Sequence, residues 1–210
     1  MSLYRSKLII FTKAPIAGRV KTRLQPRYSA QDAAHLQEYF ILKTVKMASN
    51  LMDIDIELRC APDDLHPVFQ RCHHDYQIET KSQLGVDLGE RMKNTLAEAL
   101  TEYAQAVLIG TDCPDITPAY LDEAFSRLEN GVDAVIGPAT DGGYVLLGLR
   151  RFSPLVFENV RWGTDQVLPA TQNNLLQLNW KWDELTTLRD IDTPDDLVHF
   201  PDILRQAGIT

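Results

Sequence analysis

The chain alternates short apolar runs with longer segments in which apolar residues recur at helical spacing, and this alternation restricts the fold more than any other feature. Residues 8–11 and 106–109 are continuous apolar runs of the kind found in strands buried on both faces. The segment 88–103 instead carries an apolar stripe at Leu88, Met92 and Leu96, which is typical of an amphipathic helix. Strands and helices that alternate in this way predict a three-layer α/β/α sandwich with a mostly parallel sheet.

Local signals place the other elements. The expected strands are residues 8–11, 54–58, 76–80, 106–109, 133–136 and 144–147, and the expected helices are residues 29–47, 63–72, 88–103, 164–176, 193–206 and one that begins at 117. Ser29 and Asp32 are spaced as a capping box, as are Thr193 and Asp196. At 210 residues the chain has the length of one domain, residues 1–210.

Charge is distributed unevenly along the chain. The first 31 residues carry seven Lys and Arg and no carboxylate, whereas the remainder carries 14 Lys and Arg against 29 Asp and Glu. An acidic body of this kind repels nucleic-acid backbones, so we expect no nucleic-acid partner. No apolar run has the length of a membrane span. Three isolated cysteines indicate a reducing compartment, and we expect a cytoplasmic protein.

The basic loop, residues 13–29, follows the first predicted strand. Lys13, Gly18, Arg19, Lys21 and Arg23 lie within it. A glycine lets backbone N–H groups approach a phosphate, and Lys and Arg neutralise its charge. The spacing is neither that of a Walker A loop nor that of a Gly-x-Gly-x-x-Gly motif. A solvated basic loop is the alternative to the nucleotide-phosphate site that we predict here.

Two acidic segments are candidates for a metal site. Asp112 follows the strand 106–109 directly, in a turn that contains proline, and Asp190 and Asp192 precede the last predicted helix. Mg²⁺ and Mn²⁺ prefer oxygen ligands and take several of them from phosphate and water. Because ligands bind beyond the carboxyl ends of strands in such sheets, Asp112 and the basic loop are expected to share one rim. We predict Asp112 and Asp192 as the metal ligands.

Three further segments could contact a substrate. Asp141 precedes two glycines and could hold a hydroxyl or an amine of an acceptor, although the same residues could form only a hairpin. Asp165, in the run 162–165, is a possible general base. The run 83–92 contains two glycines whose backbone could contact a base or a ribose, or which could only close a helix.

Taken together, five motifs resemble those of the radical-SAM/selenodomain-associated transferase family. They are Phe-Thr-Lys-Ala-Pro-x-x-Gly-x-Val-Lys-Thr-Arg-Leu (residues 11–24), Gly-Thr-Asp-Cys-Pro-Asp (110–115), Asp-Gly-Gly-Tyr-x-Leu-Leu-Gly-Leu (141–149), Trp-Gly-Thr-Asp (162–165) and Asp-Ile-Asp-Thr-Pro-Asp-Asp-Leu (190–197). The resemblance implies a nucleotide-diphospho-sugar transferase (GT-A-like) fold and a glycosyltransferase activity. The first motif is also similar to that of 2-phospholactate guanylyltransferases, which implies that Lys21 and Arg23 contact nucleotide phosphates and that Asp112 ligates a metal.

The resemblance leaves the reaction open because this fold serves more than one chemistry. One hypothesis is a Mg²⁺- or Mn²⁺-dependent glycosyltransferase with a nucleotide-diphospho-sugar donor and a small-molecule acceptor. A second is a nucleotidyltransferase that joins a nucleoside triphosphate to a phosphorylated acceptor. A third is a nucleotide-binding module without turnover. In the glycosyltransferase, Asp141 and Asp165 are the expected catalytic residues, which position or deprotonate the acceptor hydroxyl. Lys21→Ala is expected to weaken donor binding without disturbing the fold.

Overall fold

The computed structural model describes residues 5–209. Its strands are β1 (Ser6–Lys13), β2 (Ile54–Ala61), β3 (Glu79–Ser82), β4 (Gln105–Gly110), β5 (Ala134–Pro138), β6 (Tyr144–Leu149) and β7 (Trp182–Glu184). Its α-helices are α1 (Ala30–Ala48), α2 (Pro67–Tyr76), α3 (Leu88–Glu102), α4 (Pro118–Glu129), α5 (Val167–Gln177) and α6 (Ile203–Gln206). Three short 3-10 helices are η1 (Thr22–Leu24), η2 (Pro154–Phe157) and η3 (Asp196–His199).

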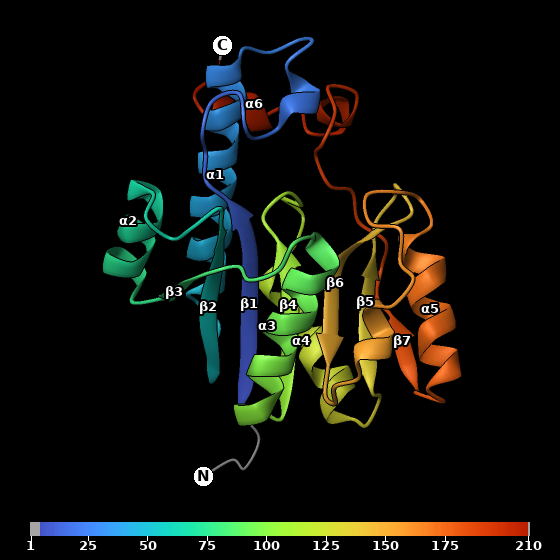
Figure 1. The fold of residues 1–210 in the computed structure, drawn as a ribbon. Helices are drawn as coiled ribbons and strands as arrows, with labels where there is room; N and C mark the ends of the chain where they lie inside the picture. The colour runs from blue at the N-terminus through green and yellow to red at the C-terminus, as the bar shows by residue number, and fades with distance from the viewer. Residues whose placement is uncertain (1–4, 210) are drawn as a thin grey trace.

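The strands form one sheet in the order β3-β2-β1-β4-β6-β5-β7. Strand β6 runs antiparallel to both of its neighbours, and every other pair is parallel. The carboxyl ends of β1, β4 and β5 therefore meet at one edge of the sheet, the upper edge in Figure 1. The mostly parallel α/β sheet that the sequence predicts is confirmed, and β1 and β4 lie where the chain turns from one side of the sheet to the other.

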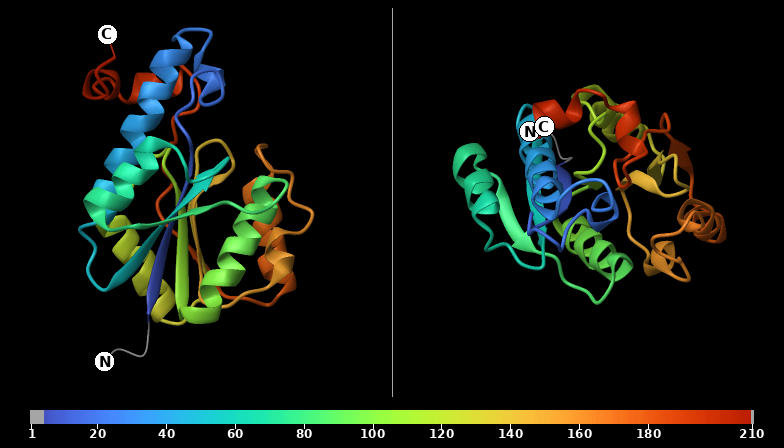
Figure 2. Two further views of the ribbon diagram at one scale, coloured as in Figure 1. Left: turned by 60° about the vertical axis from the view of Figure 1, so that its left-hand side comes forward. Right: turned by 90° about the horizontal axis from the view of Figure 1, so that it is seen from above.

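Helices cover both faces of the sheet (Figure 1 and the view from above in Figure 2). Alternate side chains of β1 enter different apolar clusters: Leu8 and Ile10 pack with residues of α1, α2 and α4, whereas Ile9 and Phe11 pack with residues of α3 and α5. This is the period of two that a strand buried on both faces requires. The expected three layers are therefore present.

A third apolar cluster lies above the carboxyl edge of the sheet. It joins Leu24 of η1 and Phe40 of α1 to Ile191, Leu197 and Ile203 of the C-terminal segment, residues 188–209. Figure 1 and the left view of Figure 2 both show the basic loop and the C-terminal segment side by side at this end of the molecule. The basic loop and the C-terminal segment thus converge over the edge at which ligands bind in such sheets.

The C-terminal segment differs from the prediction. No continuous helix runs from 193 to 206; η3 ends before Pro201, and α6 follows as one short turn. Only one half of the predicted capping box of Thr193 and Asp196 is present. Oδ2 of Asp196 accepts hydrogen bonds from the backbone N–H groups of Asp192 and Thr193 and from the Thr193 hydroxyl, but the N–H of Asp196 donates to the carbonyl oxygen of Thr193 instead of its hydroxyl. These bonds hold the segment in an irregular course that directs Asp190 and Asp192 toward the sheet. Among the described helices, none has the length and apolar character needed to cross a membrane.

Candidate active site

A cavity of about 570 Å³ opens at the carboxyl edge of the sheet between β1 and β4. Four separate parts of the chain bring charge to it, one of which is the start of α3, with Asp87 and Arg91. Lys13 and Lys21 come from the end of β1 and the basic loop, Asp112 follows β4, and Asp190 and Asp192 come from the C-terminal segment. The sequence predicted that the basic loop and Asp112 share one rim, and the structure brings them together.

Lys21 is held rigidly at the top of this cavity. Its backbone is in the left-handed region, with φ at 49°, and its side chain is only 2% exposed. The Nζ atom lies 3.0 Å from Oδ2 of Asp112, donates a hydrogen bond to the carbonyl oxygen of Ile191, and lies 5.5 Å from the centre of the Phe40 ring. Lys21 therefore fastens the basic loop to β4, to α1 and to the C-terminal segment at once.

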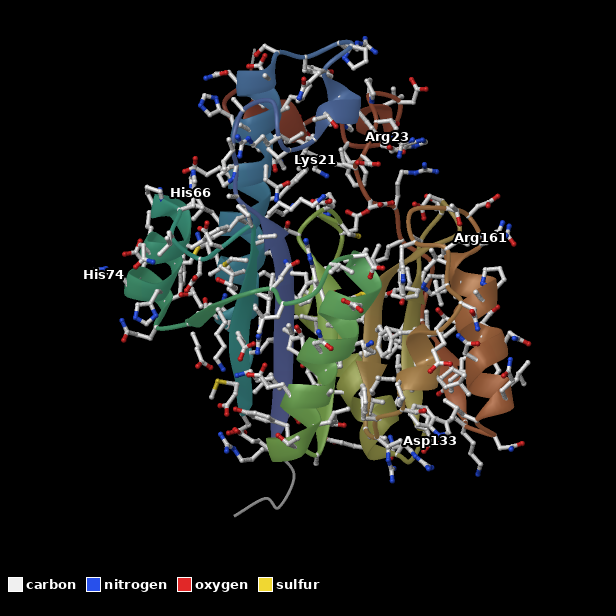
Figure 3. The ribbon with its side chains drawn as sticks, in the orientation of Figure 1. Lys21, Arg23, His66, His74, Asp133 and Arg161 are labelled. Carbon is white, nitrogen blue, oxygen red and sulfur yellow. The ribbon has the colours of Figure 1, made fainter. Side chains whose placement is uncertain are left out.

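The C-terminal segment is fixed against Asp112. The carbonyl oxygen of Asp112 accepts a hydrogen bond of 2.9 Å from the N–H of Ile191. Because Asp190 and Asp192 flank Ile191, this bond brings both carboxylates to the rim beside Asp112. The carboxylate of Asp192 then forms an ion pair of 2.5 Å with Arg23. Figure 3 shows Lys21 and Arg23 at the upper end of the molecule beside the C-terminal segment, whereas His66, which precedes α2, and His74 of α2 lie at the left.

Asp190 is the carboxylate of the cluster whose environment is most unfavourable to charge. Burial and the negative charges of Asp141 and Asp112 raise its pKa to about 6, against a smaller opposing effect of the positive charge of Lys21. Asp112, Asp141 and Asp190 are therefore close enough to repel one another, and of the three only Asp112 has an ion pair within the described residues.

A buried polar network lies directly beneath the charged groups. Thr12 of β1 and Thr111, which follows β4, approach each other within 3.3 Å through their hydroxyl oxygens, and the amide of Gln37 donates to both. These three residues are almost fully buried. Such a network fixes the spacing of the two strand ends because each of its polar groups would be costly to leave unpaired.

One wall of the cavity is a loop that side chains hold in place. The amide nitrogen of Gln83 donates to the carbonyl oxygens of Thr12 and Arg59, which leaves its Oε1 as a fixed acceptor. Arg91 donates to the carbonyl oxygen of Gly85, and the N–H of Val86 donates to a carboxylate of α3. Val86 lines the cavity although its side chain is exposed, so this wall presents an apolar surface beside a fixed hydrogen-bond acceptor.

The predicted acceptor residues, Asp141 and Asp165, lie next to each other on the opposite side. Oδ1 of Asp141 accepts a hydrogen bond of 2.8 Å from the N–H of Gly143. Gly142 has φ at +89°, and a Cβ atom added there would lie 2.6 Å from the carbonyl oxygen of Asp165. The turn 141–143 therefore packs directly against the backbone of Asp165, and both carboxylates are exposed.

The structure separates the predicted site residues into two groups. Lys13, Lys21, Asp112 and Asp192 line the cavity, whereas Gly18, Arg19, Arg23, Asp141 and Asp165 lie outside its lining. Arg23 reaches the rim through Asp192, and Asp141 is close enough to Asp190 to influence its pKa. Gly18 and Arg19 are exposed in the basic loop.

Sequence reasoning missed four residues of the site and ranked a fifth below its neighbour. The missed residues are Thr12, Gln37, Thr111 and the side chain of Gln83, and the sequence favours Asp192 over Asp190, although both line the cavity. The one available signal was the position of Thr12 and Thr111 at the ends of apolar runs. Nothing in the sequence marked Gln37, which lies among apolar residues of α1.

The carboxylates of the cavity could hold Mg²⁺ or Mn²⁺ only if phosphate and water oxygens supplied the remaining ligands. Among residues 5–209, no group of three or more His, Cys, Asp or Glu side chains is arranged to hold a metal without help. Two carboxylates with phosphate and water oxygens are, however, a common ligand set for Mg²⁺. Asp112 and Asp190 both line the cavity, so their carboxylates are the ones that could supply the protein's share of such a set.

Solved structures similar to this chain are transferases. A structure described as a "putative nucleotide-diphospho-sugar transferase" from Desulfovibrio desulfuricans G20 is 29% identical, with a TM-score of 0.83, over 98% of this chain and 99% of that one. CMP:2-keto-3-deoxy-manno-octonic acid synthetase in complex with CTP is 11% identical (TM-score 0.59; 96% and 99% covered). The inositol-1-phosphate CTP transferase from T. maritima is 15% identical (TM-score 0.55; 99% and 98% covered).

The last two similarities establish the fold, which is that of nucleotide-diphospho-sugar transferases and cytidylyltransferases. No curated protein matches the chain. A family model does match, over residues 44–164, which is more than half of the chain and includes the strand β4, Asp112 and the turn 141–143. The chain belongs to this family, described as "Uncharacterized protein conserved in bacteria (DUF2064)".

Proposed function

We propose that this protein is a metal-dependent glycosyltransferase that uses a nucleotide-diphospho-sugar donor. The observation that carries the proposal is the single cavity into which the basic loop, the turn after β4 and the C-terminal segment direct two lysines and three aspartates. The likeness to the Desulfovibrio protein, which extends over nearly the whole of both chains, supports the same class of donor. The finer assignment to the radical-SAM/selenodomain-associated transferases rests on the five sequence motifs.

The cations of the basic loop bind the donor diphosphate in this proposal. Lys13 is exposed and lines the cavity, so it can contact a phosphate directly. Arg19 and Gly18 approach from the exposed part of the loop, where the glycine, at φ of +80° and with nothing near its missing side chain, leaves the backbone accessible. Lys21 and Arg23 complete the set from the side of the C-terminal segment. Positive groups fixed in this way stabilise the charge that develops on a departing nucleoside diphosphate.

Asp112 would hold the metal together with Asp192 or Asp190. When bound, Mg²⁺ or Mn²⁺ supplies positive charge beside the diphosphate. The protein's own contribution is the position of these carboxylates, which the hydrogen bond between Ile191 and Asp112 fixes relative to each other. Both Asp190 and Asp192 line the cavity with Asp112; Asp190 has no ion pair among the described residues, whereas Asp192 would become a ligand when Arg23 releases it.

The acceptor would bind on the side of the turn 141–143. Asp141 keeps one carboxylate oxygen for an acceptor hydroxyl, since the other is held by the N–H of Gly143. Asp165 is positioned by its backbone contact with Gly142 and could accept the proton of that hydroxyl. The wall formed by Gln83 and Val86 would contact the nucleoside, with Oε1 of Gln83 accepting a hydrogen bond from the base.

A nucleotidyltransferase is the second candidate function. The observation that favours it is the number of exposed cations beyond those a diphosphate requires. Lys13, Arg19 and Arg27 are all exposed, and none forms an ion pair with another described residue. With Lys21 and Arg23 they make five cations in one loop, and Arg27, which the diphosphate above does not use, would suit the extra phosphate of a nucleoside triphosphate.

The released product distinguishes the two reactions. The protein is incubated with Mn²⁺ or Mg²⁺, a panel of nucleotide sugars and nucleoside triphosphates, and a mixture of sugar, sugar-phosphate and polyol acceptors. Acceptor-dependent release of a nucleoside diphosphate would support glycosyl transfer, and release of pyrophosphate would support nucleotidyl transfer. If donors bind and neither product forms, the protein is a nucleotide-binding module and both enzyme proposals are wrong.

A further inference from the structure

The proposed phosphate ligands and the proposed metal ligands are paired with each other. Lys21 lies 3.0 Å from Asp112, and Arg23 lies 2.5 Å from Asp192. Each pair joins a cation of the basic loop to a carboxylate of a different segment, so the two halves of the candidate site neutralise each other directly. Arg27 in the same loop and Asp115 in the turn after β4 form no ion pair with any described residue.

The arrangement around Lys21 leaves its ammonium group no position for a phosphate. The group is directed toward the carboxylate of Asp112, the carbonyl oxygen of Ile191 and the face of the Phe40 ring, and the side chain is 2% exposed. A phosphate oxygen could bind to Nζ only if one of these contacts were released. Asp112 is the contact most easily released, because its side chain is 45% exposed and can be solvated or bind a metal.

We infer that Lys21 and Arg23 are resident counter-ions of Asp112 and Asp192, and that the two pairs couple metal binding to diphosphate binding. This inference rests on the proposed function. A metal that binds alone must take the two carboxylates from Lys21 and Arg23, which leaves these cations without a partner. A diphosphate that binds alone must take the two cations from Asp112 and Asp192, which leaves these carboxylates without a partner. When both bind, the metal takes the carboxylates and the phosphates take the cations, so each ligand removes part of the cost of binding the other.

Such coupling is reciprocal, because a ligand that strengthens the binding of a second ligand is strengthened by it to the same extent. It also separates the inference from a purely structural role of the two ion pairs. If the ion pairs were only structural, removing a cation would change only the stability of the protein. If the cation is the counter-ion of a metal ligand, its removal should strengthen binding of the metal alone and weaken binding of the diphosphate alone.

Arg23→Met tests the inference at a residue whose loss does not endanger folding, since Arg23 is 69% exposed. Titration calorimetry measures the affinity for MnCl₂ alone and, separately, for inorganic pyrophosphate alone. Exposed ion pairs of this kind correspond to changes of up to about fivefold in an equilibrium constant. We expect Arg23→Met to bind Mn²⁺ about threefold more tightly than the wild type and pyrophosphate several-fold more weakly.

Arg27→Met is the matched control, because it removes the same charge from the same loop without breaking an ion pair between described residues. Its affinity for Mn²⁺ should rise less than that of Arg23→Met. If the two variants bind Mn²⁺ equally, the pairing has no role and the inference is wrong, while the proposed function stands. If neither the wild type nor either variant binds Mn²⁺ or pyrophosphate, the proposed site itself is wrong as well.

The reciprocal experiment uses the carboxylate side. Asp112→Asn releases Lys21 from its partner, so pyrophosphate alone should bind more tightly than to the wild type, and more tightly than to Asp115→Asn, which removes an exposed carboxylate of the same turn. Circular dichroism verifies that both variants are folded. Equal pyrophosphate affinity in the two variants would overturn the inference, because it would mean that loss of negative charge, and not release of Lys21, determines the affinity.

Discussion

Replacing Lys21 by methionine should destabilise the protein, although the basic character of the loop predicts that this position can be changed without disturbing the fold. Methionine keeps the apolar stem against Phe40 but removes the ammonium group. The carbonyl oxygen of Ile191 then loses its hydrogen-bond donor in a buried position. The amino-acid sequence gives no indication of this hydrogen bond, because Ile191 lies 170 positions after Lys21.

The magnitude follows from the two contacts. A buried acceptor left without a donor costs about 1–3 kcal/mol. The pair with Asp112 adds at most about 1 kcal/mol, because that carboxylate is 45% exposed and regains water. Together these amount to a loss of about 2 kcal/mol, which for a chain of this size lowers the melting temperature by about 4–8 °C.

Differential scanning calorimetry of the protein without ligands measures this loss. Lys13→Met is the matched control, because Lys13 lines the same cavity but is exposed, and its side chain makes no ion pair with a described residue. The control should melt within about 1 °C of the wild type, as is usual for surface substitutions. If Lys21→Met melts together with the control, Lys21 does not fasten the basic loop to the C-terminal segment, and its role as an anchor of the site is refuted.

Two further predictions concern a buried charge and a glycine. Glu57→Gln should lower the free energy of unfolding at pH 7 by about 3 kcal/mol, because the buried Lys7 and Arg59 lose the carboxylate they share and Arg59 keeps only the half-exposed Glu98. Burial alone would raise the pKa of Glu57, but Arg59 and neighbouring cations outweigh it and hold that pKa below 4.5. The charged form of Glu57 therefore contributes to the free energy of unfolding above pH 4.5, and this contribution is lost as the pH falls through the lowered pKa. Urea unfolding should show a smaller difference in the free energy of unfolding between the variant and the wild type at pH 3 than at pH 7. Gly142→Ala should lower the melting temperature more than Gly18→Ala. Both glycines have positive φ, but a Cβ atom at Gly142 would lie 2.6 Å from the backbone of Asp165, whereas nothing lies within 4 Å of one at Gly18. Equal melting temperatures of the two variants would contradict the contact between Gly142 and Asp165.

The sequence predicted the elements whose signals are local. The capping box of Ser29 and Asp32 is present, with both of its reciprocal hydrogen bonds, at the start of α1. The buried strands β1 and β4 appear where apolar runs predicted them, and each extends one or more residues beyond the run. These features depend on neighbours within a few positions, which is why a single chain reveals them.

Elements that depend on distant partners could not be predicted. Strand β7 has only three residues and exists because Ala134–Ile136 of β5 pairs with it. Asp196 accepts from the N–H of Thr193 as a capping box requires, but its own N–H donates to the carbonyl oxygen of Thr193 and its carboxylate also binds the N–H of Asp192. The competing hydrogen bonds decide the local structure there, and the sequence contains both possibilities.

The candidate site shows the same division. The expectation that Lys21 and Asp112 converge followed from the rule that loops after parallel strands share one edge of the sheet, and the two groups lie 3.0 Å apart. The burial of Lys21 and the placement of Asp190 beside Asp112 depend on how the C-terminal segment packs on Leu24 and Phe40. That packing is tertiary, and no spacing within the segment indicates which of its carboxylates enters the cavity.

The most direct test of the central claim, that the basic loop and the aspartates bind one diphosphate through a divalent ion, is a thermal-shift titration of nucleotide donors with and without Mn²⁺. A donor at about 100 times its dissociation constant should add about 2.7 kcal/mol of stability. We expect UDP- or GDP-sugars with Mn²⁺, or nucleoside triphosphates with Mg²⁺, to raise the melting temperature, and the effect to weaken when the metal is removed by chelation. A melting temperature that no donor changes, with or without metal, would contradict the claim.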